Sequence, residues 1–209
     1  MKDLFKRKYI PAYKVITNPF SAFEDVKEKH YGAWWQAVVP VALLFISRIF
    51  SLVFGGFLFN YTKMSEVNLF AELATVVGIY LLFVFANKNF CDLTDGDGTA
   101  TEVALTVSFA LIPYIISQFV NIILSNFFVI REAAFMSIVT VIGLLWSFFV
   151  GFAGLIRVHR YSFGKTVLTL IITVVFMALT AFLAALIFII TQQMFLFFRD
   201  IYNELVFRM

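Results

Sequence analysis

The sequence predicts an all-α polytopic membrane protein, with a bundle of five transmembrane helices and an amphipathic interfacial helix before them. The chain is 62% hydrophobic and only 14% charged, whereas soluble domains are nearer ~45–50% apolar and ~25% charged. A single core of a 209-residue chain cannot bury this excess, so the solvent must be lipid. Five continuous apolar runs and a one-sided distribution of basic residues complete the prediction.

Each apolar run has the ~20 residues that a helix needs to cross a bilayer. The spans are expected near residues 34–59, 69–87, 103–128, 134–156 and 166–191. Strands are not expected, because the runs do not alternate and exceed a barrel strand in length. Short breaks separate the runs, so consecutive helices should be antiparallel neighbours in one bundle. The chain then divides into a cytoplasmic segment (1–33), the five-helix domain (34–191) and a short extracytoplasmic tail (192–209).

The segment "NPFSAFEDVKEKHYG" before the first span predicts an amphipathic helix on the membrane surface. Asn18 can cap it, and Pro19 suits the first helical position. Phe20, Phe23 and Val26 recur at helical spacing and form its apolar side. The simplest interpretation is a solvated helix without a protein partner.

Basic residues set the orientation through the positive-inside rule. With the N-terminus in the cytoplasm, the outer side keeps only Lys63, Arg131, Arg199 and Arg208, while most other lysines and arginines lie inside. We therefore expect a cytoplasmic N-terminus, an extracytoplasmic C-terminus and residence in a bacterial cytoplasmic membrane.

Small and hydroxylated residues recur along one side of two spans, where close helix packing is expected because lipid gives helices no hydrophobic reason to associate. The stripe of the fourth span comprises Thr140, Gly143, Ser147, Gly151 and Gly154. The stripe of the fifth span comprises Thr166, Thr169, Thr173, Met177 and Thr180. Each stripe should face a neighbouring helix.

Four polar residues form a predicted intramembrane layer: Arg48, Glu72, Gln118 and Asn121. Counting ~1.5 Å of rise per residue from the cytoplasmic ends places the first three at ~20–24 Å, in the outer half of the membrane. An unpaired arginine at this depth is costly, so Arg48 and Glu72 should pair, with Gln118 or Asn121 completing their hydrogen bonds. Two roles stay open: fixing the helix register and forming a substrate path.

The stretch "CDLTDGDGTATE" places Asp92, Asp95 and Asp97 in a turn between the second and third spans. Thr99 and Glu102 have the spacing of a capping box for the third span. The aspartates could bind a divalent cation, but their D-x-x-D-x-D-G spacing does not match a calcium loop. We expect neither a metal nor a cofactor.

Docking is the other interpretation of this acidic turn. The basic loop "RVHRYSFGK" contains Arg157, His159, Arg160 and Lys165, and it should lie on the same side of the membrane. The two loops could close against one another, or both could face a cytoplasmic partner.

No catalytic constellation is recognisable. The chain has no phosphate loop, zinc pattern or nucleophile elbow, and His159 has no serine, cysteine or paired carboxylate near it in sequence. The single cysteine, Cys91, excludes an intramolecular disulfide framework. An enzyme is not expected.

Three segments together resemble the YIP family of Ypt/Rab-interacting membrane proteins, in particular its bacterial branch. They are "NPFSAFEDVKEK", "CDLTDGDGTATEV" with "ALIPYII", and "HRYSFGKTVLTLIIT". The resemblance implies five spans with a cytoplasmic N-terminus. Eukaryotic members bind Rab-type GTPases and each other, but their D-L-Y-G-P signature is absent here. The bacterial branch implies a non-enzymatic accessory protein, with some relatives accompanying transport systems.

The first functional hypothesis is therefore an adaptor in the lipid bilayer that binds another integral membrane protein, such as a subunit of a transporter complex, or a second copy of itself. No nucleic-acid partner is expected. The alternative is a carrier or channel for a small solute or ion that uses the layer of Arg48, Glu72, Gln118 and Asn121. Pro40 and Pro113 would kink helices beside that path and free backbone carbonyls.

Overall fold

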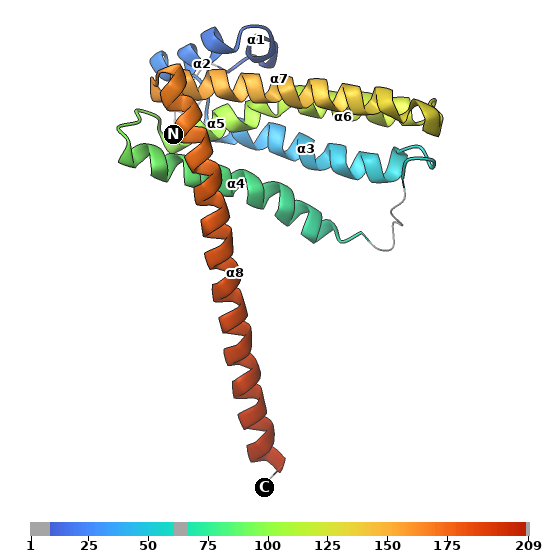
Figure 1. The fold of residues 1–209 in the computed structure, drawn as a ribbon, viewed down its shortest axis with the longest axis vertical. Coiled ribbons are helices and arrows are strands. Elements are labelled where there is room, and N and C mark those ends of the chain that lie inside the picture. Colours follow the sequence, from blue (N-terminus) through green and yellow to red (C-terminus); the bar gives the residue numbers. More distant parts are fainter. Residues whose placement is uncertain (1–8, 61–66, 208–209) are drawn as a thin grey trace.

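The computed structural model describes residues 9–60 and 67–207, and this part of the chain is helical without strands. Two short helices come first, and a group of longer helices follows (Figure 1). In chain order the elements are α1 (Ala12–Thr17), α2 (Pro19–Glu28), α3 (Trp34–Phe54), α4 (Leu69–Leu93), α5 (Ala100–Ala110), α6 (Ile112–Ser125), the 3-10 turn η3 (Ile130–Glu132), α7 (Ala133–His159) and α8 (Phe163–Phe207).

Five segments of the described chain are long and apolar enough to cross a membrane, which confirms the predicted fold class. Their mean hydropathy lies between 1.9 and 2.8. They are Trp34–Phe54, Leu69–Leu93, Ala100–Ser125, Ile130–His159 and Phe163–Glu204. Each overlaps one predicted span, although the second to fifth spans extend beyond the predicted apolar runs at one end or both.

The third span is broken into α5 and α6 at Leu111, two residues before Pro113. A proline ring has no N–H and clashes with the preceding turn, so it starts a new helix here. The Tyr114 N–H donates to Oγ of Ser147 on α7 at 2.9 Å. Pro40, by contrast, lies inside α3 without ending it.

The predicted small-residue stripe of the fourth span faces α5, α6 and α2. A Cβ atom added at Gly143 would lie 2.3 Å from Oγ of Ser117, and one added at Gly154 would lie 2.4 Å from Cγ2 of Thr106. Both distances are shorter than van der Waals contact. These helices can therefore approach α7 so closely only because glycine has no side chain at the two positions. The stripe prediction is confirmed for this span.

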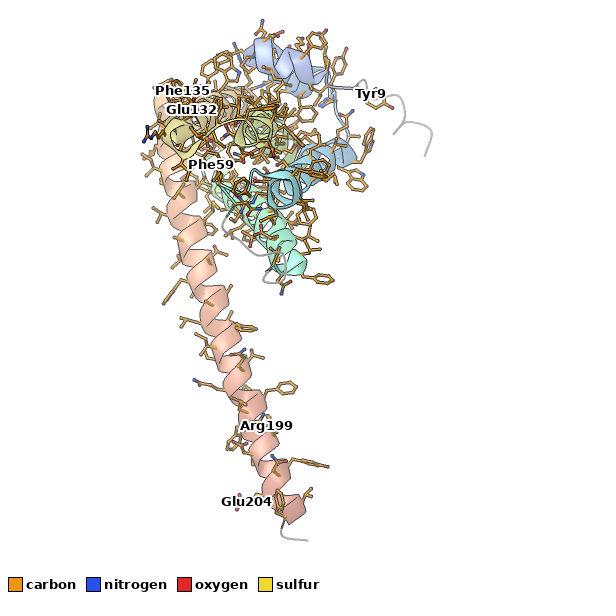
Figure 2. All side chains as sticks on the ribbon, turned by 90° about the vertical axis from the view of Figure 1, so that its right-hand side faces the viewer. Tyr9, Phe59, Glu132, Phe135, Arg199 and Glu204 are labelled. Carbon is orange, nitrogen blue, oxygen red and sulfur yellow. The ribbon has the colours of Figure 1, made fainter. Side chains whose placement is uncertain are left out.

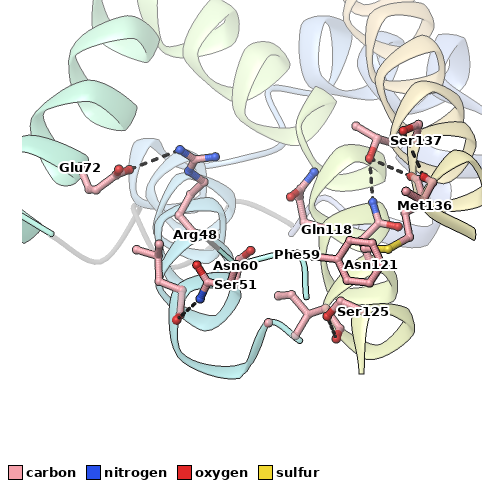
Figure 3. A pocket seen from close by; sticks show the side chains of 15 residues that line it. Arg48, Ser51, Phe59, Asn60, Glu72, Gln118, Asn121, Ser125, Met136 and Ser137 are labelled. Carbon is pink, nitrogen blue, oxygen red and sulfur yellow. Dashed lines mark hydrogen bonds and ion pairs between the residues drawn. The ribbon is translucent and has the colours of Figure 1, made fainter. Parts of the chain in front are cut away.

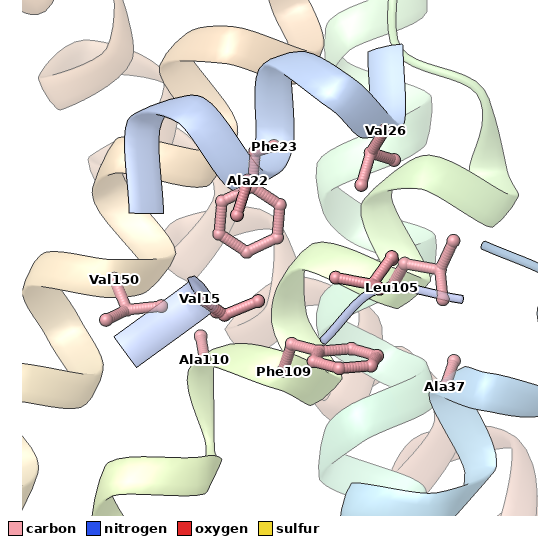
Figure 4. Packing of buried hydrophobic residues seen from close by; sticks show 10 residues of the cluster. Val15, Ala22, Phe23, Val26, Ala37, Leu105, Phe109, Ala110 and Val150 are labelled. Atoms are coloured by element: carbon pink, nitrogen blue, oxygen red, sulfur yellow. The ribbon is translucent and has the colours of Figure 1, made fainter. Parts of the chain in front are cut away.

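The amphipathic helix forms as predicted, but its apolar side does not lie on lipid. Oδ1 of Asn18 accepts from the Ser21 N–H at 3.3 Å, with Pro19 at the first helical position. Phe23 and Val26 are almost completely buried, in a cluster that also includes residues of α5 and α7 (Figure 4). The apolar side of α2 is therefore covered by the bundle itself, while its place at the membrane surface and its lack of a protein partner stay predictions.

The fifth span differs most from expectation. The first part of α8 packs on α4, with Thr166, Thr169 and Thr173 of the predicted stripe buried. Nδ2 of Asn87 on α4 donates to Oγ1 of Thr173 at 3.2 Å. Beyond this part α8 leaves the other helices and continues as one helix to Phe207 (Figure 1; side chains in Figure 2). The predicted tail from residue 192 is therefore helical to that point, because no glycine or proline interrupts it.

Close packing at Gly154 gives a testable prediction. Gly154→Ala should lower the free energy of unfolding by about 1–3 kcal/mol, because the new methyl group overlaps Thr106 and the Phe23 ring, 2.9 Å away. The matched control is Gly78→Ala in α4, where a Cβ meets nothing within 4 Å. This control should be neutral or stabilising by up to ~1 kcal/mol. Thermal unfolding in mild detergent measures both, and equal melting temperatures would contradict the packing.

Candidate functional site

A cavity of about 530 Å³ lies between α3, α4, α6 and α7, and we call it the Arg48 cavity (Figure 3). It is lined by all four residues of the predicted polar layer: Arg48, Glu72, Gln118 and Asn121. Arg48 lies less than two turns, or about 9 Å, before α3 ends, and Glu72 lies in the first turn of α4. The cavity is therefore near the helix ends opposite to the two short N-terminal helices.

The predicted ion pair between Arg48 and Glu72 is present. A terminal guanidinium nitrogen of Arg48 lies 3.6 Å from Oε2 of Glu72, and the two side chains are 50% and 30% exposed (Figure 3). This distance is longer than a hydrogen bond. The pair is therefore loose, and within the described part of the chain most of the guanidinium N–H groups remain available.

The amide residues do not complete this pair, contrary to expectation. Nδ2 of Asn121 donates to Oγ1 of Thr140 on α7 at 2.7 Å, and Thr140 donates to the Met136 carbonyl at 3.1 Å. Oδ1 of Asn121 is buried without a hydrogen-bond partner among the described residues. Gln118 lines the cavity beside them. Asn121 prefers α7 because the hydroxyl of Thr140 lies within hydrogen-bond reach.

Some lining residues were missed by the sequence analysis. Ser137 and Asn60 also line the cavity. Ser137 lies three residues before Thr140 on the same side of α7, so the small-residue stripe could have revealed it. Asn60 lies after the first span, where no helical pattern marks its position.

At the other end of the molecule, residues 94–99 and residues 157–165 close against one another, and we call them the loop pair. Nζ of Lys165 donates to the Thr94 carbonyl at 2.6 Å, and the Tyr161 hydroxyl donates to the same oxygen at 3.2 Å. Nε of Arg160 lies 3.9 Å from Oδ2 of Asp97. The structure thus shows the first of the two predicted docking modes, closure of the acidic turn on the basic loop.

His159 is buried inside the loop pair. Its Nε2 is 3.0 Å from Oδ1 of Asn87, and its ring stacks on Tyr161 with centroids 5.3 Å apart. A Cβ atom at Gly98 would lie 2.6 Å from the imidazole Cε1, and one at Gly96 would lie 3.0 Å from Nδ1. The two glycines therefore give the imidazole its space, in addition to forming the turn. With 2% of its surface exposed, His159 does not face a partner.

Tyr161 keeps its proton in this setting. Burial raises the pKa of Tyr161 to about 12, so the phenol stays a hydrogen-bond donor at physiological pH. Its ring also lies under Nζ of Lys165, 4.0 Å from the centroid.

The three predicted aspartates have different surroundings. Asp92 pairs with Lys88 within α4, Asp97 pairs with Arg160, and Asp95 is exposed in a left-handed conformation with φ of 55°. Throughout residues 9–60 and 67–207, no group of three or more His, Cys, Asp and Glu side chains is placed to hold a metal ion.

Lys27 of α2 joins the N-terminal helices to the loop pair, a role that the sequence analysis missed. Its Nζ donates to the Asp97 carbonyl and lies 3.1 Å from Oε2 of Glu102. Glu102 accepts from the Thr99 N–H at 2.9 Å in the predicted capping box, which is confirmed. Only the charged side of α2 offered a signal for Lys27, without indicating its partner.

A second cavity, of about 300 Å³, lies where α2 meets the loop pair. Lys27, Arg157 and Arg160 line it together with Glu24 and Glu28. Arg157 lies 3.9 Å from Glu24, and its guanidinium carbon is 5.5 Å from the centroid of the Phe20 ring. Both signs of charge therefore occur on one partly exposed surface, which we call the α2 surface.

Nearby on α1 and α2, two lysines surround Asp25. Hydrogen bonds from Lys14 and Lys29 hold the pKa of Asp25 below its usual value. Nζ of Lys29 is 2.6 Å from Oδ1, and the other oxygen of Asp25 contacts Lys14. Because a lowered pKa favours folding above the usual carboxyl pKa, this link holds α1 to α2 at neutral pH and weakens in acid.

Five apolar helices, with polar clusters at both ends of the bundle, define an integral membrane protein. The model of the Yip1 domain family matches residues 13–193, so the chain belongs to that family. The match includes α1 and α2 as well as the spans, which agrees with their burial in the bundle. No curated protein and no solved structure matches the chain.

The Arg48–Glu72 pair predicts a reciprocal effect of charge reversal. Arg48→Glu and Glu72→Arg alone place like charges together in the membrane, so each should reduce the yield of folded, monodisperse protein several-fold. The double reversal restores opposite charges and should recover most of that yield. Fluorescence-detected size-exclusion chromatography measures all three variants, and a double variant no better than the singles would disprove the pairing.

Proposed function

We propose that the protein is a non-enzymatic adaptor of a bacterial cytoplasmic membrane, with its N-terminus in the cytoplasm and its C-terminus outside. Its partner is another integral membrane protein, of which a transporter subunit is one example, or a second copy of the chain. Membership of the Yip1 family is compatible with this role. The length of α8 and the exposure of its second half are the observations that carry the proposal.

The α8 helix has 45 residues, which corresponds to about 68 Å. A bilayer core is only ~30 Å thick and needs ~20 residues. From Ala181 to Phe207 every residue with a described side chain is exposed, so no other part of the described chain covers this half. Lipid can cover its first turns, but not the whole remaining length of a helix that crosses the membrane.

The last part of α8 contains more than one turn of exposed apolar residues between polar ones. Met194, Phe195, Leu196, Phe197 and Phe198 are consecutive and exposed, and Gln193 and Arg199 flank them. Exposed apolar patches of this kind often mark contacts with protein or membrane. This supports a contact between the end of α8 and another membrane protein. The family match ends at residue 193, so this part lies beyond it.

The α2 surface offers a second area for contact in the cytoplasm. Two of its ion pairs, Arg157–Glu24 and Arg160–Asp97, are long, at 3.9 Å, and their side chains are roughly half exposed. Such pairs contribute little to stability, so a partner can exchange them for its own charges at small cost. The loop pair holds this surface in one conformation through Lys27 and Lys165.

A non-enzymatic role is supported by the state of the reactive groups. Cys91 is completely buried, and its Sγ lies 3.9 Å from Oδ1 of Asn87. His159 is enclosed by the loop pair, 2% exposed. Neither group can reach a substrate without opening of the loops.

The proposed orientation predicts the accessibility of introduced cysteines. In intact cells a membrane-impermeant maleimide should label Asp200→Cys on α8 but not Asp97→Cys in the loop pair. The two aspartate side chains are 71% and 58% exposed, so burial does not bias the comparison, and native Cys91 is buried. Lysis should make Asp97→Cys reactive. Labelling of Asp97→Cys in intact cells would show that the proposed orientation is wrong.

The partner contact predicts site-specific crosslinking. A photoreactive benzoylphenylalanine at Phe197, which is 62% exposed, should give adducts of discrete protein mass in native membranes. The matched control is the same replacement at Phe148 on α7, 66% exposed in the middle of a span, which should crosslink mainly to lipid. Mass spectrometry then tells a second copy from another protein. Equal patterns at both positions, with only monomer in mild detergent, would contradict the adaptor role.

The Arg48 cavity favours a second candidate, a carrier of small solutes or ions. Its volume of about 530 Å³ and its polar lining are compatible with this role. A flux into reconstituted vesicles that is lost in Arg48→Leu would favour the carrier over the adaptor.

A further inference from the structure

We propose that the Arg48 cavity is a binding site for a head group that carries both a phosphate and a primary ammonium, as in phosphatidylethanolamine. The same chemistry could come from a membrane lipid or from free phosphoethanolamine, and the experiment below separates the two sources. The inference does not depend on the adaptor role.

Opposite charges beside one another favour a zwitterionic ligand. An anion bound to Arg48 alone would lie close to the Glu72 carboxylate, because only 3.6 Å separates the two groups. A cation bound to Glu72 alone would meet Arg48 in the same way. A ligand with both charges places its phosphate on the guanidinium and its ammonium on the carboxylate, so that each charge has an opposite neighbour.

Unused hydrogen-bonding groups favour the same ligand. Among the described residues Arg48 pairs with Glu72, and a guanidinium has five N–H donors. A phosphate oxygen accepts from these N–H groups, and a primary ammonium carries three N–H donors for the Glu72 carboxylate. The ligand therefore gives hydrogen bonds to both members of the loose pair.

The position of the cavity is suitable for a lipid head group. It lies within about two turns of the ends of α3 and α6 and beside the first turn of α4, so a head group need move only slightly below the interface. The lining also includes the apolar side chains of Leu52, Ile122 and Met136. Its volume of about 530 Å³ falls in the ~300–1,000 Å³ range of small-molecule sites.

The lining also distinguishes a primary amine from choline. A quaternary ammonium cannot donate hydrogen bonds, and proteins bind it with cages of several aromatic rings. Among the described residues, Phe59 is the single aromatic side chain that lines the cavity. Phosphatidylcholine should therefore bind more weakly, as should phosphatidylglycerol, whose phosphate has no ammonium to balance Glu72.

Competition between lipids on the wild-type protein tests the proposal first. Native mass spectrometry of the purified protein in mixed micelles should show phosphatidylethanolamine retained roughly tenfold more strongly than phosphatidylcholine or phosphatidylglycerol of the same acyl chains. Equal retention of the three lipids would overturn the proposal without any variant.

Variants then place the lipid in the cavity. Arg48→Gln with Glu72→Gln removes both charges together, so neither is left unpaired, and it should abolish the preference. The matched control is Arg199→Gln with Asp200→Asn, which removes an exposed pair 3.8 Å apart on α8 and should leave the preference unchanged. If the first double variant does not fold, Glu72→Gln removes only the carboxylate that holds the ammonium and should reduce the preference several-fold. A preference that survives in the folded cavity variants would overturn the assignment.

Free phosphoethanolamine separates the two sources of the ligand. If the source is a lipid, millimolar phosphoethanolamine should displace little of the bound phosphatidylethanolamine, and vesicles should show no flux of the free compound. Strong displacement together with flux would assign the cavity to a soluble solute and support the carrier. The lipid test is independent of the adaptor test. Phe197 lies outside the cavity, so a failure to find crosslinks there would not change the lipid preference.

Discussion

Close approach to α7 is the constraint on which the bundle depends. Lipid is as apolar as the side chains, so helices in a membrane associate through packing and hydrogen bonds. Gly143 lets Ser117 of α6 approach, and Gly154 accommodates Thr106 of α5 and the Phe23 ring of α2 at one point. The broken third span depends on the same surface, since Ser147 accepts the N–H of Tyr114 that the break releases. Without these contacts the N-terminal helices would have no surface to cover.

Hydropathy alone was sufficient to predict the five spans, because a run of ~20 apolar residues has few alternatives to a transmembrane helix. Local chemistry likewise predicted the Asn18 cap and the Thr99–Glu102 box, which need only neighbours in sequence. Pairing of Arg48 with Glu72 could be predicted because charge in lipid is costly and the depth of each residue follows from helical rise.

What sequence could not predict depends on contacts between distant segments. The apolar side of α2 could be covered by lipid or by protein. It packs on protein because Gly154, which has no side chain, leaves space for the Phe23 ring. Hydrophobicity does not say which helix a span packs on, so the divergence of α8 carries no signal in its sequence. Likewise, the sequence contains several acidic residues that could pair with Lys27. Only the fold shows that Lys27 contacts the Asp97 carbonyl and the Glu102 carboxylate.

Two unpartnered polar atoms show how the ends of the molecule differ. Nδ1 of His159 and Oδ1 of Asn121 both lack a hydrogen bond within the described residues. Around His159 the two glycines and Tyr161 leave no space for a ligand beside the imidazole. The loop pair is therefore closed by contacts between its own residues. Asn121 borders a cavity of about 530 Å³ beside a loose ion pair. Since desolvated polar groups gain most from a new partner, the unpartnered acceptor at the Arg48 cavity leaves free energy for binding there. The two ends therefore differ in what they offer a ligand: His159 is enclosed by its own neighbours, whereas the Arg48 cavity keeps polar groups within reach of a bound molecule.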